Sequence, residues 1–187
     1  MKNKPIIIIN GEPNSIFLEI FFKSLKNKSI KSPMILIVSQ KLLNLQMKKL
    51  GFKKKIKVLD LKKINSYLLD NDSINIIDVN YNTKKAFENI SSKSNLYISN
   101  CFKIAFKLIK LGYTNKFING PISKKNFLKK KYLGVTEYLA KKFKVKKVAM
   151  LIYNKKLSVC PITTHLPLKS VSKNIKKKTI IDKIHLV

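Results

Sequence analysis

The sequence contains no arginine and no tryptophan, and it has few acidic residues. All 40 basic residues are therefore lysine, against nine aspartates and glutamates, and the formal net charge is +31. Arginine is the side chain best suited to bidentate contacts with phosphates and base edges, so its absence argues against a dedicated nucleic-acid binder. Because the lysines are spread through every predicted helix, we interpret the charge as compositional drift, with a functional basic surface as the alternative.

Long apolar runs and paired cysteines are also missing. No run approaches the roughly 20 apolar residues that a membrane-spanning helix needs. The isoleucines at 6–9 are too few for a signal-peptide core, and no small-residue cleavage site follows them, so we expect a cytoplasmic protein with no membrane partner. Cys101 and Cys160 lie far apart, without the spacing of a zinc finger. We therefore expect two buried, reduced thiols and no structural zinc site.

What the sequence does contain is an alternation of short β-branched runs with longer amphipathic segments, which is typical of an α/β domain with a mostly parallel sheet. Hydrophobic residues make up 45% of the chain, as in globular proteins. We expect strands at 6–10, 34–38, 56–59, 74–79, 116–119 and 147–153, the last forming a hairpin with 157–162. We expect helices beginning near residue 14, with apolar positions Ile16, Ile20, Phe21 and Leu25, and then at 40–50, 96–111, 121–128, 136–143 and after 167.

Three of these strands run directly into polar turns, and ligands of α/β proteins bind at such carboxyl ends. The turns are Asn10-Gly11-Glu12-Pro13, Asn119-Gly120-Pro121-Ile122-Ser123-Lys124 and Thr163-Thr164-His165-Leu166-Pro167. Taken singly, each of them is better explained as an ordinary turn. Lys124 could pair with a phosphate, although it is one of 40 lysines.

His165 is the residue that most directly indicates chemistry. It follows two threonines whose hydroxyls could fix the tautomer of the imidazole, as a metal ligand requires. The alternative is a hydrogen-bonded loop histidine, because no His/Asp/Glu cluster stands near it in the sequence. The only other histidine, His185, is expected to be half exposed near the end of a lysine-rich helix.

A further candidate opens the helix predicted at 136–143. Thr136 could donate to a bound phosphate together with the free amides of the helix N-terminus. A plain helix cap is the alternative, with Glu137 favourable in the first turn.

Four segments, in this order and spacing, resemble the 4-hydroxythreonine-4-phosphate dehydrogenase family. They are Gly11-Glu12-Pro13, Gly120-Pro121-Ile122-Ser123-Lys124, Gly134-Val135-Thr136-Glu137-Tyr138 and Thr163-Thr164-His165-Leu166-Pro167-Leu168. The segment at 147–151 is similar to the strand that precedes the family's threonine-histidine loop. The resemblance spans essentially the whole chain but only a little over half of a full member, so we expect a truncated enzyme with an incomplete active site.

The resemblance implies an architecture like that of isocitrate and isopropylmalate dehydrogenases. It consists of two α/β/α sandwich domains with mostly parallel sheets, and the active site lies in the cleft between them. We expect an incomplete first α/β domain at 1–128 and the start of a second at 129–187. The family also implies a homodimer.

The implied activity is the NAD- or NADP-dependent oxidation of 4-phosphohydroxy-L-threonine to 2-amino-3-oxo-4-phosphooxybutanoate in pyridoxine phosphate biosynthesis, followed by decarboxylation. A divalent metal (zinc, magnesium or cobalt), held by histidines from both subunits, would act as a Lewis acid. By position, the resemblance makes His165 a metal ligand and Thr136 a substrate contact. Asn119 and Lys124 are weaker substrate-binding candidates on the cleft wall.

The sequence departs from the family pattern at Val135, where the family has a substrate-binding histidine. Valine neither ionises nor hydrogen-bonds. The remaining metal histidines belong to the part of the family beyond this chain, so we do not expect the chain to catalyse alone. One alternative is a related dehydrogenase acting on a four-carbon phospho-acid such as threonate or erythronate phosphate. The other is a non-catalytic remnant or basic binding module.

Overall fold

The computed structural model describes residues 4–26, 30–129 and 131–187. The chain forms two compact units, Met1–Phe127 and Leu128–Val187, called unit 1 and unit 2 below. No helix in the described ranges is long and apolar enough to cross a membrane.

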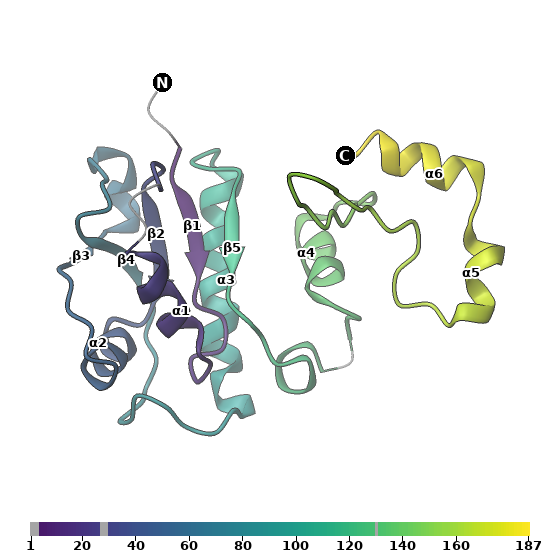
Figure 1. Cartoon of the computed structure of the whole chain (residues 1–187). Helices are drawn as coiled ribbons and strands as arrows, with labels where there is room; N and C mark the ends of the chain where they lie inside the picture. Colours follow the sequence, from purple (N-terminus) through teal and green to yellow (C-terminus); the bar gives the residue numbers. More distant parts are fainter. Residues whose placement is uncertain (1–3, 27–29, 130) are drawn as a thin grey trace. The chain divides into compact units, whose positions relative to one another are not determined.

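Unit 1 is built on a five-stranded sheet in the order β3-β4-β2-β1-β5, in which every neighbouring pair is parallel (Figure 1). The strands are β1 (Ile6–Ile9), β2 (Met34–Val38), β3 (Ile56–Val58), β4 (Ile74–Asp78) and β5 (Phe117–Asn119). These are the strands expected from the β-branched runs of this region, each within about one residue at either end. The α/β fold with a parallel sheet is therefore confirmed.

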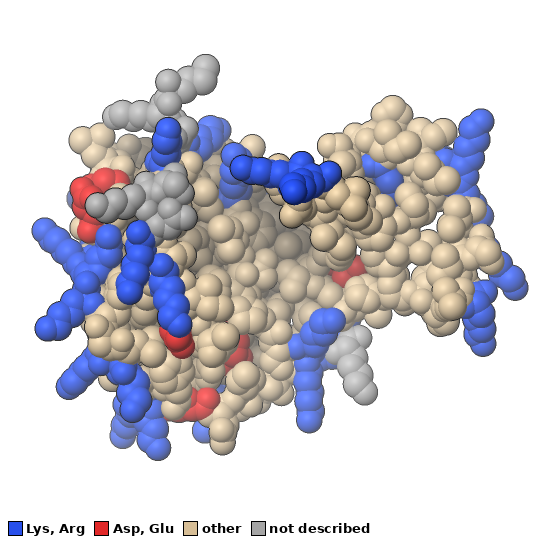
Figure 2. Space-filling model, in the orientation of Figure 1, with Lys and Arg blue, Asp and Glu red and all other residues tan. Residues whose placement is uncertain are grey.

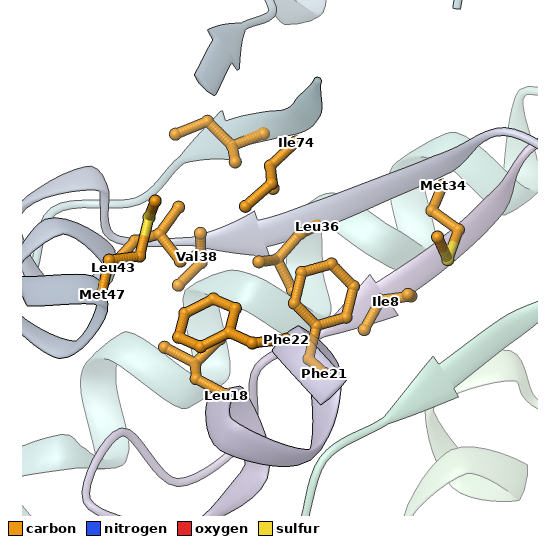
Figure 3. Close-up of a cluster of buried hydrophobic side chains, with 11 residues drawn as sticks. Ile8, Leu18, Phe21, Phe22, Met34, Leu36, Val38, Leu43, Met47 and Ile74 are labelled. Atoms are coloured by element: carbon orange, nitrogen blue, oxygen red, sulfur yellow. The ribbon is translucent and has the colours of Figure 1, made fainter. Parts of the chain in front are cut away.

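Helices cover both faces of this sheet, as a parallel sheet requires. They are α1 (Phe17–Ser24), α2 (Gln40–Lys49) and α3 (Asn95–Lys110), with short turns η1 (Leu61–Ser66) and η2 (Ser92–Ser94). One face packs against α1 and α2 in the cluster of Figure 3, which joins Ile8 and Leu36 of the sheet to Phe22 and Leu43 of the helices. The alternate residues Ile7 and Ile35, which are fully buried, point to the opposite face, against which α3 packs.

The buried face of α1 differs from the expected one. Ile16 and Ile20 are 65% and 53% exposed, whereas Leu18, Phe21 and Phe22 are buried. Because the helix begins at Phe17, these three residues stand at i, i+3 and i+4 and form one apolar stripe, which is the stripe that meets the sheet.

The turns that follow β1 and β5 are in direct backbone contact at the carboxyl edge of the sheet. The Glu12 amide donates to the Pro121 carbonyl at 2.8 Å, and the Gly120 amide donates to the Ile9 carbonyl at 2.7 Å. A Cβ atom added to Gly120 would lie 2.2 Å from the Asn10 carbonyl oxygen. Glycine is therefore required at position 120 by space.

The helix expected at 121–128 is replaced by a short π-helical turn, η3 (Lys124–Leu128). The Gly120 carbonyl, which as the N-cap would accept the first bond of such a helix, accepts from the Asn119 side-chain amide, and the Pro121 carbonyl accepts from the Glu12 amide. The turn starts instead at Ser123, whose hydroxyl accepts from the Asn126 amide at 3.1 Å.

Unit 2 contains α4 (Val135–Phe143), α5 (Leu168–Asn174) and α6 (Lys177–Ile184). Among its described residues, only Leu128, Gly134 and Tyr138 are buried. It exposes many large apolar side chains, including Leu133, Tyr153, Leu157, Leu168 and Ile184. Unit 2 therefore has almost no hydrophobic core of its own.

Two expectations for unit 2 are wrong. The hairpin of 147–153 with 157–162 is reduced to one isolated antiparallel bridge, Ile152 to Val159. Both residues are largely exposed, so no apolar layer holds a longer ladder. The single last helix is two, because the backbone is extended at Ile175 and Lys176.

The two thiols also differ from each other. Cys101 is buried, and this burial raises its pKa to about 12, whereas Cys160 is only partly buried. The expectation of a buried thiol is thus confirmed for Cys101 alone. Lysine side chains project at many separate places on the surface seen in Figure 2.

The contact between the two turns predicts an unusually costly glycine substitution. We expect Gly120→Ala to destabilise the chain by about 3 kcal/mol, because the methyl group meets rigid backbone. Gly112→Ala is the control: it forces a side chain into a left-handed conformation (φ 71°) but meets nothing within 4 Å, so it should cost only about 1 kcal/mol. Urea unfolding followed by circular dichroism measures both. Equal losses would contradict the close contact.

Candidate functional site

Two of the four candidate residues, Asn119 and Lys124, belong to unit 1. Asn119 is the last residue of β5, and its side-chain amide donates to the Gly120 carbonyl at 3.2 Å. Lys124 is exposed at the first position of η3, and its ammonium group makes no hydrogen bond within the described ranges. Asn119 therefore supports the turn, whereas Lys124 is available to an anionic ligand.

A buried carboxylate stands behind this edge. Glu12 is 2% exposed, and its Oε2 accepts from the Ser94 hydroxyl at 2.8 Å. Its Oε1 accepts from the Asn14 amide at 3.4 Å. Because Ser94 precedes the first residue of α3, Glu12 ties the turn after β1 to the start of that helix. This is a structural role that its place in Gly11-Glu12-Pro13 did not reveal.

Tyr97 organises the polar layer next to Glu12. Its hydroxyl accepts from the Asn10 side-chain amide at 3.3 Å and from the Ser39 backbone amide at 3.2 Å. Burial raises the pKa of Tyr97 well above its usual value, so the phenol stays protonated. Two amide oxygens of this region, on Asn10 and Gln46, are buried and lack a partner among the described residues, which is the setting of ordered internal water.

The other two candidates, Thr136 and His165, belong to unit 2. His165 is exposed and has a left-handed backbone (φ 57°) in the loop before α5. Its Nε2 lies 3.7 Å from the position that a Cβ atom of Gly134 would occupy. The loop thus brings the imidazole against the start of α4, two residues before Thr136. The second histidine, His185, is exposed rather than half exposed.

The start of α4 offers both donors and an acceptor. Gly134 is its N-cap and supplies no side-chain cap, so the amides of the first turn have no capping acceptor. Thr136 is partly buried, and its hydroxyl makes no hydrogen bond to any residue that the structure describes. The Glu137 Oε2 is buried without a hydrogen-bond partner in the described chain and lies 3.0 Å from the same Gly134 Cβ position.

These residues fit part of a divalent-metal site. An imidazole nitrogen is a preferred ligand of zinc and cobalt, and a bare carboxylate oxygen beside it adds favourable negative charge. Within the described ranges, no group of three or more His, Cys, Asp or Glu side chains comes together. His165 is therefore a candidate for a single ligand, and the described residues do not bring a complete coordination sphere together.

Sequence reasoning did not select Glu137 as a site residue. The available signal was its scarcity, because Glu137 and Asp182 are the only acidic residues of unit 2. Asp182 is bound to Lys147 at 2.7 Å, which leaves Glu137 as the acid without an ion pair in the described part of this unit.

The fold and the edge geometry define a class: a parallel α/β protein with polar turns at the carboxyl ends of its strands. A family model described as pyridoxal phosphate biosynthetic protein PdxA matches residues 29–187. The chain belongs to this family.

Curated relatives are similar in sequence to almost the whole of this chain. A 4-hydroxythreonine-4-phosphate dehydrogenase of Aquifex aeolicus is 31% identical over 195 residues, which cover 99% of this chain and 57% of the relative. The enzyme of the same name from a Sulfurihydrogenibium species is 32% identical over 190 residues, 97% of this chain and 56% of the relative. The chain thus spans little more than half the length of these relatives.

Solved structures share the fold. A 4-hydroxythreonine-4-phosphate dehydrogenase from Burkholderia phymatum superimposes with a TM-score of 0.84 at 23% identity, over 98% of this chain and 56% of that structure. The enzyme from Klebsiella pneumoniae gives the same TM-score at 22% identity, over 98% of this chain and 56% of that structure.

The backbone at His165 predicts how its loop tolerates substitution. Asparagine adopts left-handed conformations readily, whereas a β-branched residue does not, so His165→Asn should leave the loop intact and His165→Val should open it. We expect proteolytic cleavage within 163–167 to be about tenfold faster in His165→Val and unchanged in His165→Asn, because cleavage follows the population of the open form. Equal rates would show that the left-handed conformation is not maintained.

Proposed function

We propose that this chain supplies the first part of an NAD- or NADP-dependent 4-hydroxythreonine-4-phosphate dehydrogenase. The observation that carries the proposal is the placement of the His165 imidazole against the uncapped start of α4, in a chain of this family. The proposed reaction oxidises the secondary alcohol of 4-phosphohydroxy-L-threonine, and loss of carbon dioxide from the resulting β-keto acid follows.

The roles of the residues follow from their surroundings. His165 would bind the divalent metal through an imidazole nitrogen. The metal, when bound, would polarise the reacting hydroxyl as a Lewis acid. Thr136 and the first-turn amides of α4 would hold an anionic group of the substrate, because no side chain of the described residues caps this helix start. Lys124 would add a positive charge, and Asn119 would act through the Gly120 turn.

The rest of the catalytic machinery would come from the part of the family that this chain does not span, together with a homodimer partner. The exposed apolar residues of unit 2 support this proposal, because a unit with so little buried surface needs further protein to cover it. We propose the cytoplasm as its location.

Val135 favours a second candidate substrate. Because the family pattern has a substrate-binding histidine at this position, a valine removes a polar contact. The second candidate is a related four-carbon phospho-acid, such as threonate or erythronate phosphate, whose recognition would not need that contact. A basic binding module has no comparable support, and retention on DNA that survives physiological salt would be its signature.

The proposal predicts activity in a completed protein. Fusion of this chain to the matching remainder of the Aquifex aeolicus relative should yield zinc- or cobalt-dependent reduction of NAD or NADP with 4-phosphohydroxythreonine. We expect His165→Ala to lower kcat/KM at least about 100-fold by removing a metal ligand, whereas His185→Ala should not change it.

Assaying the same fusion with threonate and erythronate phosphate separates the two candidates. Turnover of these acids alone would favour the second. A folded fusion that is inactive on all of them, or activity that is unchanged in His165→Ala, would contradict the proposed function.

A further inference from the structure

Glu137 is the one carboxylate of unit 2 whose surroundings do not explain it. Its Oε2 is buried and accepts no hydrogen bond from any described residue. A buried acceptor without a donor is costly, so proteins keep one where a donor arrives from elsewhere. Lysines are abundant along this unit, yet none of those described forms an ion pair with Glu137.

The His165 imidazole lies near this oxygen and can supply an N–H donor. The Glu137 Oε2 lies 3.0 Å, and the His165 Nε2 lies 3.7 Å, from the same point, where a Cβ atom of Gly134 would stand. Because residue 134 is glycine, no side chain stands at this point next to the two groups. The two atoms form no hydrogen bond in this structure, but each lies within 4 Å of the same point, which a side chain at position 134 would occupy.

The threonines that precede His165 do not hold its imidazole. Neither Thr163 nor Thr164 makes a hydrogen bond to the imidazole in the described chain, although their hydroxyls were the expected partners. The left-handed backbone of His165 instead directs its ring toward the start of α4.

We propose that Glu137 is a positioning residue that accepts a hydrogen bond from the Nε2–H of His165. This bond selects one neutral tautomer and leaves Nδ1 as the ligating nitrogen. The inference deepens the proposed function, on which the metal-binding role of His165 rests. The pairing of the two side chains does not depend on that role.

The test determines by NMR spectroscopy which ring nitrogen of His165 carries the proton. Because the chain has only two histidines, selective ¹⁵N labelling gives two ring systems, and His185→Gln assigns them. The spectra are recorded at mildly alkaline pH, because ¹⁵N shifts distinguish the two tautomers of a neutral imidazole. We expect His165 to be predominantly Nε2–H in the metal-free chain. Glu137→Ala should remove this preference, and Glu137→Gln should restore it in part, because its amide oxygen still accepts.

A matched control is available in unit 1. Glu19 occupies the first turn of α1, as Glu137 occupies that of α4, and it is paired with Lys23 on the surface. Glu19→Ala removes the same charge from the same helical position and should leave the His165 tautomer unchanged. The backbone amide spectrum of α4 verifies that each variant keeps its fold. An Nδ1–H ring in the unaltered chain, or an Nε2–H ring that persists in Glu137→Ala, overturns the proposal.

Titration with Zn²⁺ separates this proposal from the metal assignment. We expect Glu137→Ala to weaken Zn²⁺ binding at His165 about 10-fold to 100-fold, as for other groups that orient a metal-binding histidine. If the tautomer depends on Glu137 but Zn²⁺ does not shift the His165 nitrogens, the pairing stands and the proposed metal role fails. If Zn²⁺ binds at His165 equally well in Glu137→Ala, the positioning role fails.

Discussion

A parallel sheet must be covered on both faces, and the core of unit 1 depends on this constraint. In unit 1, α1 and α2 cover one face and α3 covers the other, so the central strands are almost completely buried. Unit 2 has three short helices and one isolated bridge, and almost all of its described residues retain some exposure. The chain therefore combines a unit that has its own hydrophobic core with a unit that has almost none.

This difference extends to the candidate site. The turns of unit 1 are joined by backbone hydrogen bonds and packed too closely for side chains at Gly11 and Gly120, and Glu12 and Tyr97 add side-chain hydrogen bonds. The candidates of unit 2 stand on an exposed loop and on an uncapped helix start. Positioning of His165 consequently needs a local partner, and Glu137 has the location and the free oxygen for that role. The proposed role of this arrangement depends on the membership of the chain in the pyridoxal phosphate biosynthetic protein PdxA family.

Much of unit 1 could be predicted from the sequence because its strands are continuous β-branched runs, for which period and burial agree. The prediction failed where tertiary contacts decided the outcome. The turn after β5 is hydrogen-bonded to the turn after β1 and leads into a π turn instead of the expected helix, and the exact start of α1 moved its apolar stripe away from Ile16. The motif containing His165 was visible in the sequence, but its proximity to Gly134 and Glu137 was not, because it depends on a left-handed residue.

Hydrogen–deuterium exchange of the 187-residue chain, resolved by mass spectrometry, measures whether the two units differ in local stability. If unit 1 folds through its own core and unit 2 does not, β1, β2 and β4 should exchange only through global unfolding. The segment 145–187 should then exchange orders of magnitude faster, through openings that cost little free energy. Protection of 145–187 equal to that of the sheet would contradict the account, because it would show that unit 2 is stable without any further protein to cover it.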